Sequence, residues 1–159
     1  MSNHITIHTD GGSRGNPGPA AIGIVIVEER ELRNARDSSR GKSIFSKKEF
    51  GEYIGETTNN EAEYRAVIFA LKKLKSLIGS DKCCESLVEL LMDSELVVKQ
   101  LNKEYKLKDK NIQNFFIEIW NLTFDFGEVS FHHIPREENR EADRIVNQVL
   151  DREGSKLNL

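Results

Sequence analysis

The sequence predicts an α/β domain built on one five-stranded mixed sheet with helices packed against it. Two observations indicate this class. The first third of the chain carries three strand-like segments in succession, and the remainder alternates helical spacing with short apolar runs. Three successive strands favour an antiparallel meander, and the later crossovers favour two parallel strands beside it. A length of 159 residues is typical of one domain, which we expect to span residues 1–159.

Five segments have the pattern of strands. Ile5 and Ile7 alternate with polar residues up to Asp10, and the next apolar segment is rich in β-branched residues. The predicted strands are residues 4–10, 20–27, 48–56, 86–93 and 128–134. The charged residues 29–47 show no clear periodicity, which predicts a long connection or an extended ribbon tip between the second and third strands.

Four segments have the spacing of amphipathic helices. They are residues 57–79, 94–102, 111–122 and 137–151. The first begins with cap candidates that include Thr58 and Asn59, and Gly79 is expected to end it. Ser94 and Asn139 are the expected caps of the second and fourth helices.

The overall charge argues weakly against a protein that coats nucleic acid by charge alone. The net charge is −3 and the isoelectric point is about 5.9, so long-range attraction to a polyanion is weak. Residues 30–48 and 103–110 are nevertheless locally basic. Solvated loop charge explains either stretch, but a local field is also enough to hold a nucleic acid.

Membrane and disulfide chemistry are not expected. The N-terminal residues lack the basic and apolar regions of a signal peptide, and the longest apolar run, residues 20–27, is too short to span a bilayer. The two cysteines, Cys83 and Cys84, are adjacent, which disfavours a bond between them and predicts reduced thiols. We therefore expect a cytoplasmic monomer with no membrane segment.

Two carboxylates follow apolar strands. Asp10 ends the first predicted strand, and Asp93 ends the strand after the first helix. In open α/β sheets, ligand sites form outside the carboxyl ends of parallel strands, so both acids are candidates for one site. For either Asp alone, a helix cap or a turn remains the alternative role.

A third carboxylate is predicted to face the core. Glu61 and Glu63 are two residues apart on the first helix, so they point to nearly opposite sides. Helical steps from Glu63 reach only apolar residues, namely Ala66, Val67, Ala70, Leu71 and Leu74. A carboxylate on that stripe needs a partner, and a divalent cation shared with other carboxylates would supply it. Stabilisation of an N-terminal Glu by the helix dipole is the alternative.

The last predicted helix carries several acids. Asp143 lies one turn after Asn139, and Glu137, Glu138 and Glu141 are close by in sequence. Spacing alone does not choose among them. Carboxylates that converge on one sheet edge suit Mg²⁺, and two such ions can stabilise the attacking and leaving oxygens of a phosphoryl displacement. The residues thus favour metal-assisted phosphate or phosphodiester chemistry.

Four segments, in this order, resemble ribonuclease H type 1. They are TDGGSRGNPGPAAIG (9–23), TTNNEAEYRAVIFAL (57–71), LLMDSELVVKQLN (90–102) and HHIPREENREADRIVN (132–147). Each is modestly specific, and four in order with matching strand and helix context are strong. The resemblance covers nearly the whole chain and implies the ribonuclease H-like fold.

The resemblance implies a four-carboxylate metal site at Asp10, Glu63, Asp93 and Asp143. It implies two Mg²⁺ ions, with Mn²⁺ as a substitute, and hydrolysis of the RNA strand of RNA/DNA hybrids to leave 5′-phosphate and 3′-hydroxyl ends. Asp10 would contact both ions, Asp143 the ion that activates water, and Glu63 and Asp93 the ion at the leaving group. The resemblance, not the spacing, selects Asp143.

The resemblance also implies further site residues. His133 matches a family histidine that assists proton handling or product release, and His132 is expected to face the other way along its strand. A purely structural role is the alternative for His133. The implied substrate contacts, at a minor groove where 2′-hydroxyls distinguish RNA, are Gly11, Gly12, Asn16, Asn59, Asn60, Ser94 and Arg136. Helix capping is the alternative for Asn59 and Asn60.

One departure concerns the substrate. Many family members carry a basic, Trp-containing helix and loop after the third motif, whereas here residues 103–110 lead directly into the next helix. The chain therefore resembles the shorter prokaryotic subgroup, and duplex RNA becomes a second candidate substrate beside the hybrid. We hypothesise that the basic residues 30–48 compensate for the missing protrusion.

Two other function classes remain as alternatives. One is a catalytically weak or silent nucleic-acid-binding module of the same fold, against which the presence of all four acids argues. The other is a different nuclease of the same superfamily. An exonuclease would carry Asp-x-Glu on the first strand, where this chain has Asp-Gly-Gly, and a transposase would sit within a longer chain with DNA-binding domains.

Overall fold

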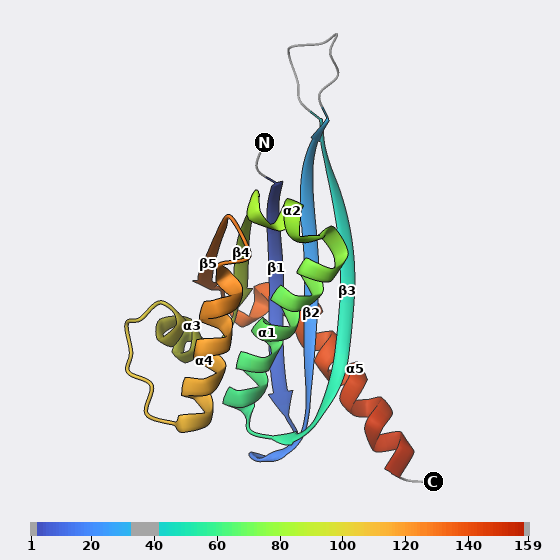
Figure 1. The fold of residues 1–159 in the computed structure, drawn as a ribbon. Coiled ribbons are helices and arrows are strands. Elements are labelled where there is room, and N and C mark those ends of the chain that lie inside the picture. The colour runs from blue at the N-terminus through green and yellow to red at the C-terminus, as the bar shows by residue number, and fades with distance from the viewer. Residues whose placement is uncertain (1–2, 33–41, 158–159) are drawn as a thin grey trace.

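The computed structural model describes residues 3–32 and 42–157 and has the expected α/β architecture (Figure 1). Its elements in order are β1 (Asn3–Ser13), β2 (Gly18–Leu32), β3 (Lys42–Thr57), α1 (Asn59–Ile78), α2 (Ser80–Cys84), β4 (Ser86–Met92), α3 (Glu95–Leu101), α4 (Lys110–Thr123), β5 (Glu128–His133), a 3₁₀ turn (Arg136–Glu138) and α5 (Arg140–Leu157). The strand order in the sheet is β3-β2-β1-β4-β5. The first three strands are antiparallel, and β4 and β5 are parallel to β1, which confirms the predicted fold class.

Helices cover both faces of the sheet, with α1 in front of β1 and β2 and α5 behind in Figure 1. The alternation in β1 buries Ile5 and Ile7 against α1, in a core that includes Tyr64 and Leu71. On the other face, smaller apolar clusters join α5 to β2, as between Val146 and Ala21. Within the described ranges, no helix has both the length and the apolar character needed to cross a membrane.

Several boundaries differ from the sequence prediction. β1 continues three residues beyond Asp10, because β2 pairs with it as far as Ser13. β2 and β3 extend into a paired ribbon that reaches Leu32 and Lys42, so the ribbon interpretation of residues 29–47 holds for its described part. The hypothesis that the basic residues 30–48 compensate for the missing protrusion remains a prediction, because three of its arginines, Arg33, Arg36 and Arg40, lie outside the described residues. The short helix α2 was not predicted.

The helix ends largely follow the predicted capping. Thr58 caps α1 by accepting a hydrogen bond from the Glu61 N–H, and Gly79 ends it with a φ of 81°. Ser94 caps α3 as predicted. Asn139 directly precedes α5, and its backbone carbonyl accepts from the Asp143 N–H. The expected side-chain cap does not form, because the Asn139 amide donates to the Thr9 carbonyl and its side-chain oxygen has no hydrogen-bond partner among the described residues.

Two glycines let the helices approach the sheet on either side of Asp10. A Cβ at Gly11 would overlap the backbone carbonyl of Ala62 and lie 2.6 Å from the Glu63 nitrogen. A Cβ at Gly23, which pairs with Asp10 across the ladder, would lie 2.5 Å from the Ala142 carbonyl oxygen on the opposite face. The first turns of α1 and α5 can rest on the sheet only where these side chains are absent.

The first prediction tests the contact at Gly11. Gly11→Ala should lower the free energy of unfolding by about 1–3 kcal/mol, because the methyl group would displace the first turn of α1. Gly12→Ala is the matched control, since its Cβ would meet only Val146 Cγ1 at 3.5 Å. Urea denaturation measures both effects. Equal costs for the two variants would contradict a close helix–strand contact at Gly11.

Candidate active site

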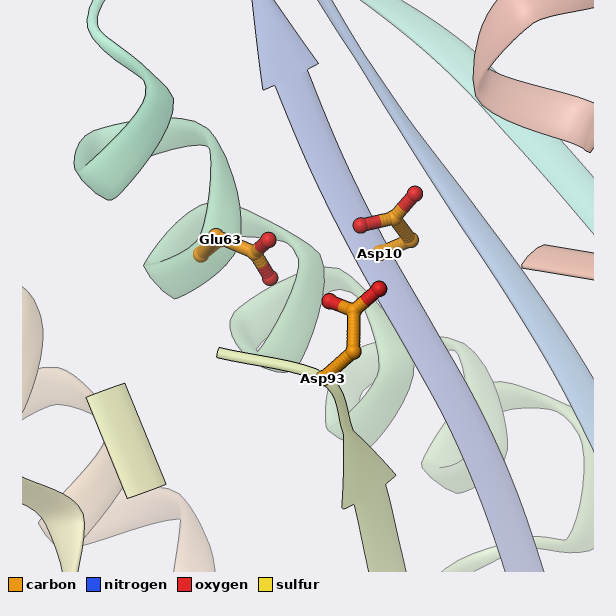
Figure 2. A group of neighbouring side chains, drawn as sticks. All are labelled: Asp10, Glu63 and Asp93. Atoms are coloured by element: carbon orange, nitrogen blue, oxygen red, sulfur yellow. The ribbon is translucent and has the colours of Figure 1, made fainter. Parts of the chain in front are cut away.

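Three carboxylates converge near the carboxyl ends of the parallel strands β1 and β4 (Figure 2). Asp10 lies on β1, Glu63 lies just after the first turn of α1, and Asp93 directly follows β4. One oxygen from each lies within 4.8 Å of the others. β1 and β4 are parallel neighbours, so each places an acid near the same end of the sheet. The close approach of α1 to Gly11 brings Glu63 to these two acids.

Burial gives these acids unusual proton affinities. Asp10 and Glu63 are only 6% and 8% exposed. Burial, together with the charges of Asp93 and Asp143, raises the pKa of Asp10 from 3.8 to about 7. Burial and then the charge of Asp10 raise the pKa of Glu63 well above its usual range. The pKa of Asp93 is raised by burial and held back mainly by Arg136.

The cluster has the properties of a cation site. Glu63 Oε2 is buried and has no hydrogen-bond partner in the part of the chain that the structure describes, although the Glu63 carboxylate faces two others. Such an oxygen is costly to bury unless a positive charge or a proton compensates it. Three carboxylates in this arrangement match the hard oxygen ligands that Mg²⁺ and Mn²⁺ accept. The donor set therefore fits a divalent metal.

Asp143 lies in the same cavity but outside the tight group. The cavity measures about 480 Å³, and its lining includes the three clustered acids, Asp143 and Arg136. Asp143 projects from the first turn of α5 and is near enough to Asp10 for a side-chain hydrogen bond that helps to raise the pKa of Asp10. The fourth acid thus approaches from the helix on the opposite face of the sheet.

Comparison with known proteins matches this geometry. A family model described as reverse transcriptase-like matches residues 8–149. The structure of LC11-RNase H1, isolated from compost by a metagenomic approach, superposes with a TM-score of 0.76 at 42% sequence identity, over 94% of this chain and 96% of that one. The chain belongs to the ribonuclease H-like family.

Curated relatives extend the comparison. Ribonuclease HI of Halobacterium salinarum is 37% identical over 142 residues, which are 89% of this chain and 62% of that protein. A bifunctional protein of Mycobacterium tuberculosis is 32% identical over 147 residues, 92% of this chain and 35% of that protein. The chain thus spans about a third of the mycobacterial protein. LC11-RNase H1 has also been crystallised with an RNA/DNA hybrid, in a structure that matches with a TM-score of 0.75 and 42% identity over 93% of this chain and 97% of that one.

In this ribonuclease H-like domain, two asparagines tie the glycine-rich loop to α1. The Asn59 N–H donates to Asn16 Oδ1 at 3.0 Å, and the Ser13 N–H donates to Asn59 Oδ1 at 2.9 Å. Asn59 and Gly12 line the cavity, whereas Asn16 and Asn60 are exposed beside it and are absent from its lining. Sequence reasoning missed this clamp, because the paired residues are more than 40 positions apart.

The remaining expected residues occupy two settings. His133, exposed at the end of β5, has Nε2 3.3 Å from the Asp93 carbonyl oxygen, while His132 contacts Ser130 and Glu89 instead. The two histidines therefore have different neighbours, as strand alternation predicts. The Ser94 hydroxyl is engaged as the cap of α3. Neither His133 nor Ser94 lines the cavity.

The second prediction uses the raised pKa of Asp10. Without divalent metal, the free energy of unfolding should fall as the pH rises from about 4 to about 7. The folded state holds the Asp10 proton more tightly than the unfolded chain does, so this stabilisation is complete below the ordinary pKa and lost as the pH passes about 7. Urea denaturation in the presence of EDTA measures how the free energy of unfolding changes with pH over this range. Addition of Mg²⁺ should restore stability near its upper end.

Asp10→Asn is the control for this slope. The neutral amide cannot titrate, so its stability should depend less on pH over the same range and should respond less to Mg²⁺. An identical pH slope in the wild-type protein and in Asp10→Asn would show that the buried Asp10 carboxyl is not its source.

Proposed function

We propose that this chain is a type 1 ribonuclease H, which hydrolyses the RNA strand of RNA/DNA hybrids and leaves 5′-phosphate and 3′-hydroxyl ends. The observation that carries the proposal is the buried cluster of Asp10, Glu63 and Asp93, with an unpaired Glu63 oxygen inside it. Support also comes from the 42% identical relative that was crystallised with an RNA/DNA hybrid. The short connection between α3 and α4 is consistent with the smaller prokaryotic subgroup.

The metal in this proposal is Mg²⁺, with Mn²⁺ as a substitute. Asp10, Glu63, Asp93 and Asp143 would hold two ions, with Asp10 central because it is near both Glu63 and Asp143. When bound, such ions supply Lewis-acid stabilisation to the attacking and leaving oxygens of the phosphodiester. The low exposure of Asp10 and Glu63 keeps water away from the protein side of the site and strengthens every charge interaction there.

Substrate is proposed to lie across the glycine-rich loop and the start of α1. Asn16 and Asn59 use their side-chain oxygens in the clamp, so the group that each can offer to a nucleic acid is its amide NH₂. An amide donor suits the oxygen of a 2′-hydroxyl. The absence of side chains at Gly11 and Gly12 lets a backbone approach closely. Asn60, Ser94 and Arg136 complete the proposed contacts, with Arg136 suited to a phosphate.

The third prediction tests the reaction and its site together. The wild-type protein with Mg²⁺ should cleave the RNA strand of a hybrid and leave duplex DNA intact. Asp10→Asn and Glu63→Gln should lower the rate by more than about a hundredfold, because loss of a ligand exceeds the 10–100-fold effect of losing an outer partner. Gel analysis of end-labelled hybrid, duplex RNA and duplex DNA, with each metal, measures the rates.

Glu61→Gln is the matched control, since Glu61 lies on the same helical turn but hydrogen-bonds Asn111. It should retain the wild-type rate. No cleavage of any substrate by the wild-type protein would favour a silent nucleic-acid-binding module. Cleavage that survives Asp10→Asn would overturn the proposed site, and cleavage of duplex RNA at a comparable rate would widen the substrate class.

The fourth prediction concerns His133. If this residue handles protons or assists product release, His133→Ala should lower kcat by up to about 10²-fold with little change in KM. It should also alter the dependence of kcat on pH. His132→Ala is the control, because its ring contacts Ser130 and Glu89, whereas His133 contacts the Asp93 carbonyl. Equal effects of the two substitutions would reduce His133 to a structural residue.

A further inference from the structure

Asn139 links the backbone beside Asp10 on β1 to the backbone of Asp143 on α5. Its side-chain Nδ2 donates to the Thr9 carbonyl oxygen at 2.9 Å, and Thr9 directly precedes Asp10 in β1. The backbone carbonyl oxygen of Asn139 accepts from the Asp143 N–H at 3.2 Å, at the start of α5. Asn139 is only 1% exposed. One buried residue therefore touches the backbone beside Asp10 and the backbone of Asp143.

This link is poorly suited to a role in stability alone. A carbonyl oxygen cannot donate, so the group that faces Thr9 must be the amide NH₂. The Asn139 Oδ1 atom is then left buried, with no hydrogen-bond partner among residues 3–32 and 42–157. Burial of an unpaired acceptor costs about as much as one hydrogen bond contributes, so the net stabilisation by this side chain is small. What remains is the geometric connection between β1 and α5.

Other contacts hold α5 from a different direction. Glu141 pairs with Lys47, and Arg144 pairs with Glu49 at 3.1 Å, both on β3 and both exposed. Exposed ion pairs hold a helix loosely, and these reach α5 from the strand two places away from β1 in the sheet. The hydrogen bond from Asn139 is buried and joins α5 to β1 itself.

We propose that Asn139 is a positioning residue that sets the separation of Asp10 and Asp143 and so governs the affinity for the cation that these two carboxylates would share. The proposal rests on the proposed function in one respect, the presence of a metal between them. Mg²⁺ requires nearly ideal octahedral geometry, so small shifts of one carboxylate weaken binding. Loss of an outer partner of a metal ligand commonly lowers metal affinity by about 10–100-fold.

Isothermal titration calorimetry with Mn²⁺ on the full chain tests this without any substrate. Asn139→Ala should weaken binding of the more weakly held ion by about 10–100-fold and leave the tighter site, formed by the clustered acids, less affected. Asn102→Ala is the matched control, because the Asn102 amide also donates to a strand carbonyl, that of Phe131 at 3.1 Å, but on β5, two strands away from β1 in the sheet. It should leave both affinities unchanged.

A kinetic measurement gives a second readout. With RNA/DNA hybrid at low metal concentration, Asn139→Ala should lower kcat while KM for the hybrid stays the same, and a higher metal concentration should restore kcat. A purely structural role would instead lower the melting temperature without changing the metal dependence. Asn139→Ser keeps an oxygen suited to a helix start, but its side chain is too short to reach Thr9. If the alanine variant does not fold, the Mn²⁺ affinity and the metal dependence of kcat are measured on the serine variant instead.

The outcomes are distinguishable. Unchanged affinity for the weaker ion in the Asn139 variants, or an equal loss in Asn102→Ala, overturns the positioning role. If the wild-type protein binds Mn²⁺ with this dependence on Asn139 but cleaves no hybrid, the positioning role stands and the proposed nuclease function fails. If the wild-type protein binds no Mn²⁺, both fail.

Discussion

The direct contact between the first turn of α1 and β1 at Gly11 is the constraint on which the site depends. Any side chain at this position would collide with the backbone of Ala62, so the helix can rest on the strand only at glycine. That contact places Glu63, one residue further along α1, beside Asp10, one residue earlier on β1. Because packed interiors transmit strain, a displacement of α1 at this contact would move Glu63 away from Asp10.

The same contact creates an electrostatic conflict within the fold. Two nearly fully buried carboxylates and a third half-buried one meet where burial penalises their charged forms. A sheet edge designed for stability alone would carry apolar residues here. Protons relieve this conflict at low pH, and a divalent cation bound at neutral pH, as in the proposed function, would relieve it there, so stability and metal binding would be coupled through the same side chains. Strongly raised pKa values within a cavity are typical of functional sites.

The fourth acid shows how both faces of the sheet contribute. α1 packs on one face and α5 on the other (Figure 1), and Gly23 opposite Asp10 allows α5 the same close approach that Gly11 allows α1. Asp143 reaches the cavity from that second face, and Asn139 joins its backbone to β1. Hydrogen bonds of Asn16 and Asn59 join the glycine-rich loop to the start of α1 beside the cavity.

The sequence by itself determined the class of sheet, the caps of α1 and α3 and the inward orientation of Glu63, because alternation, capping and helical periodicity are local properties of the chain. It also placed acids at strand ends. Spacing alone could not select Asp143 among its acidic neighbours, and it assigned Asn139 to a cap that the structure replaces with a bond to Thr9. The sequence did not predict the hydrogen bonds between the glycine-rich loop and Asn59 either. These features join residues between 43 and 130 positions apart, and only the packing of α1 and α5 on the sheet decides which distant groups meet.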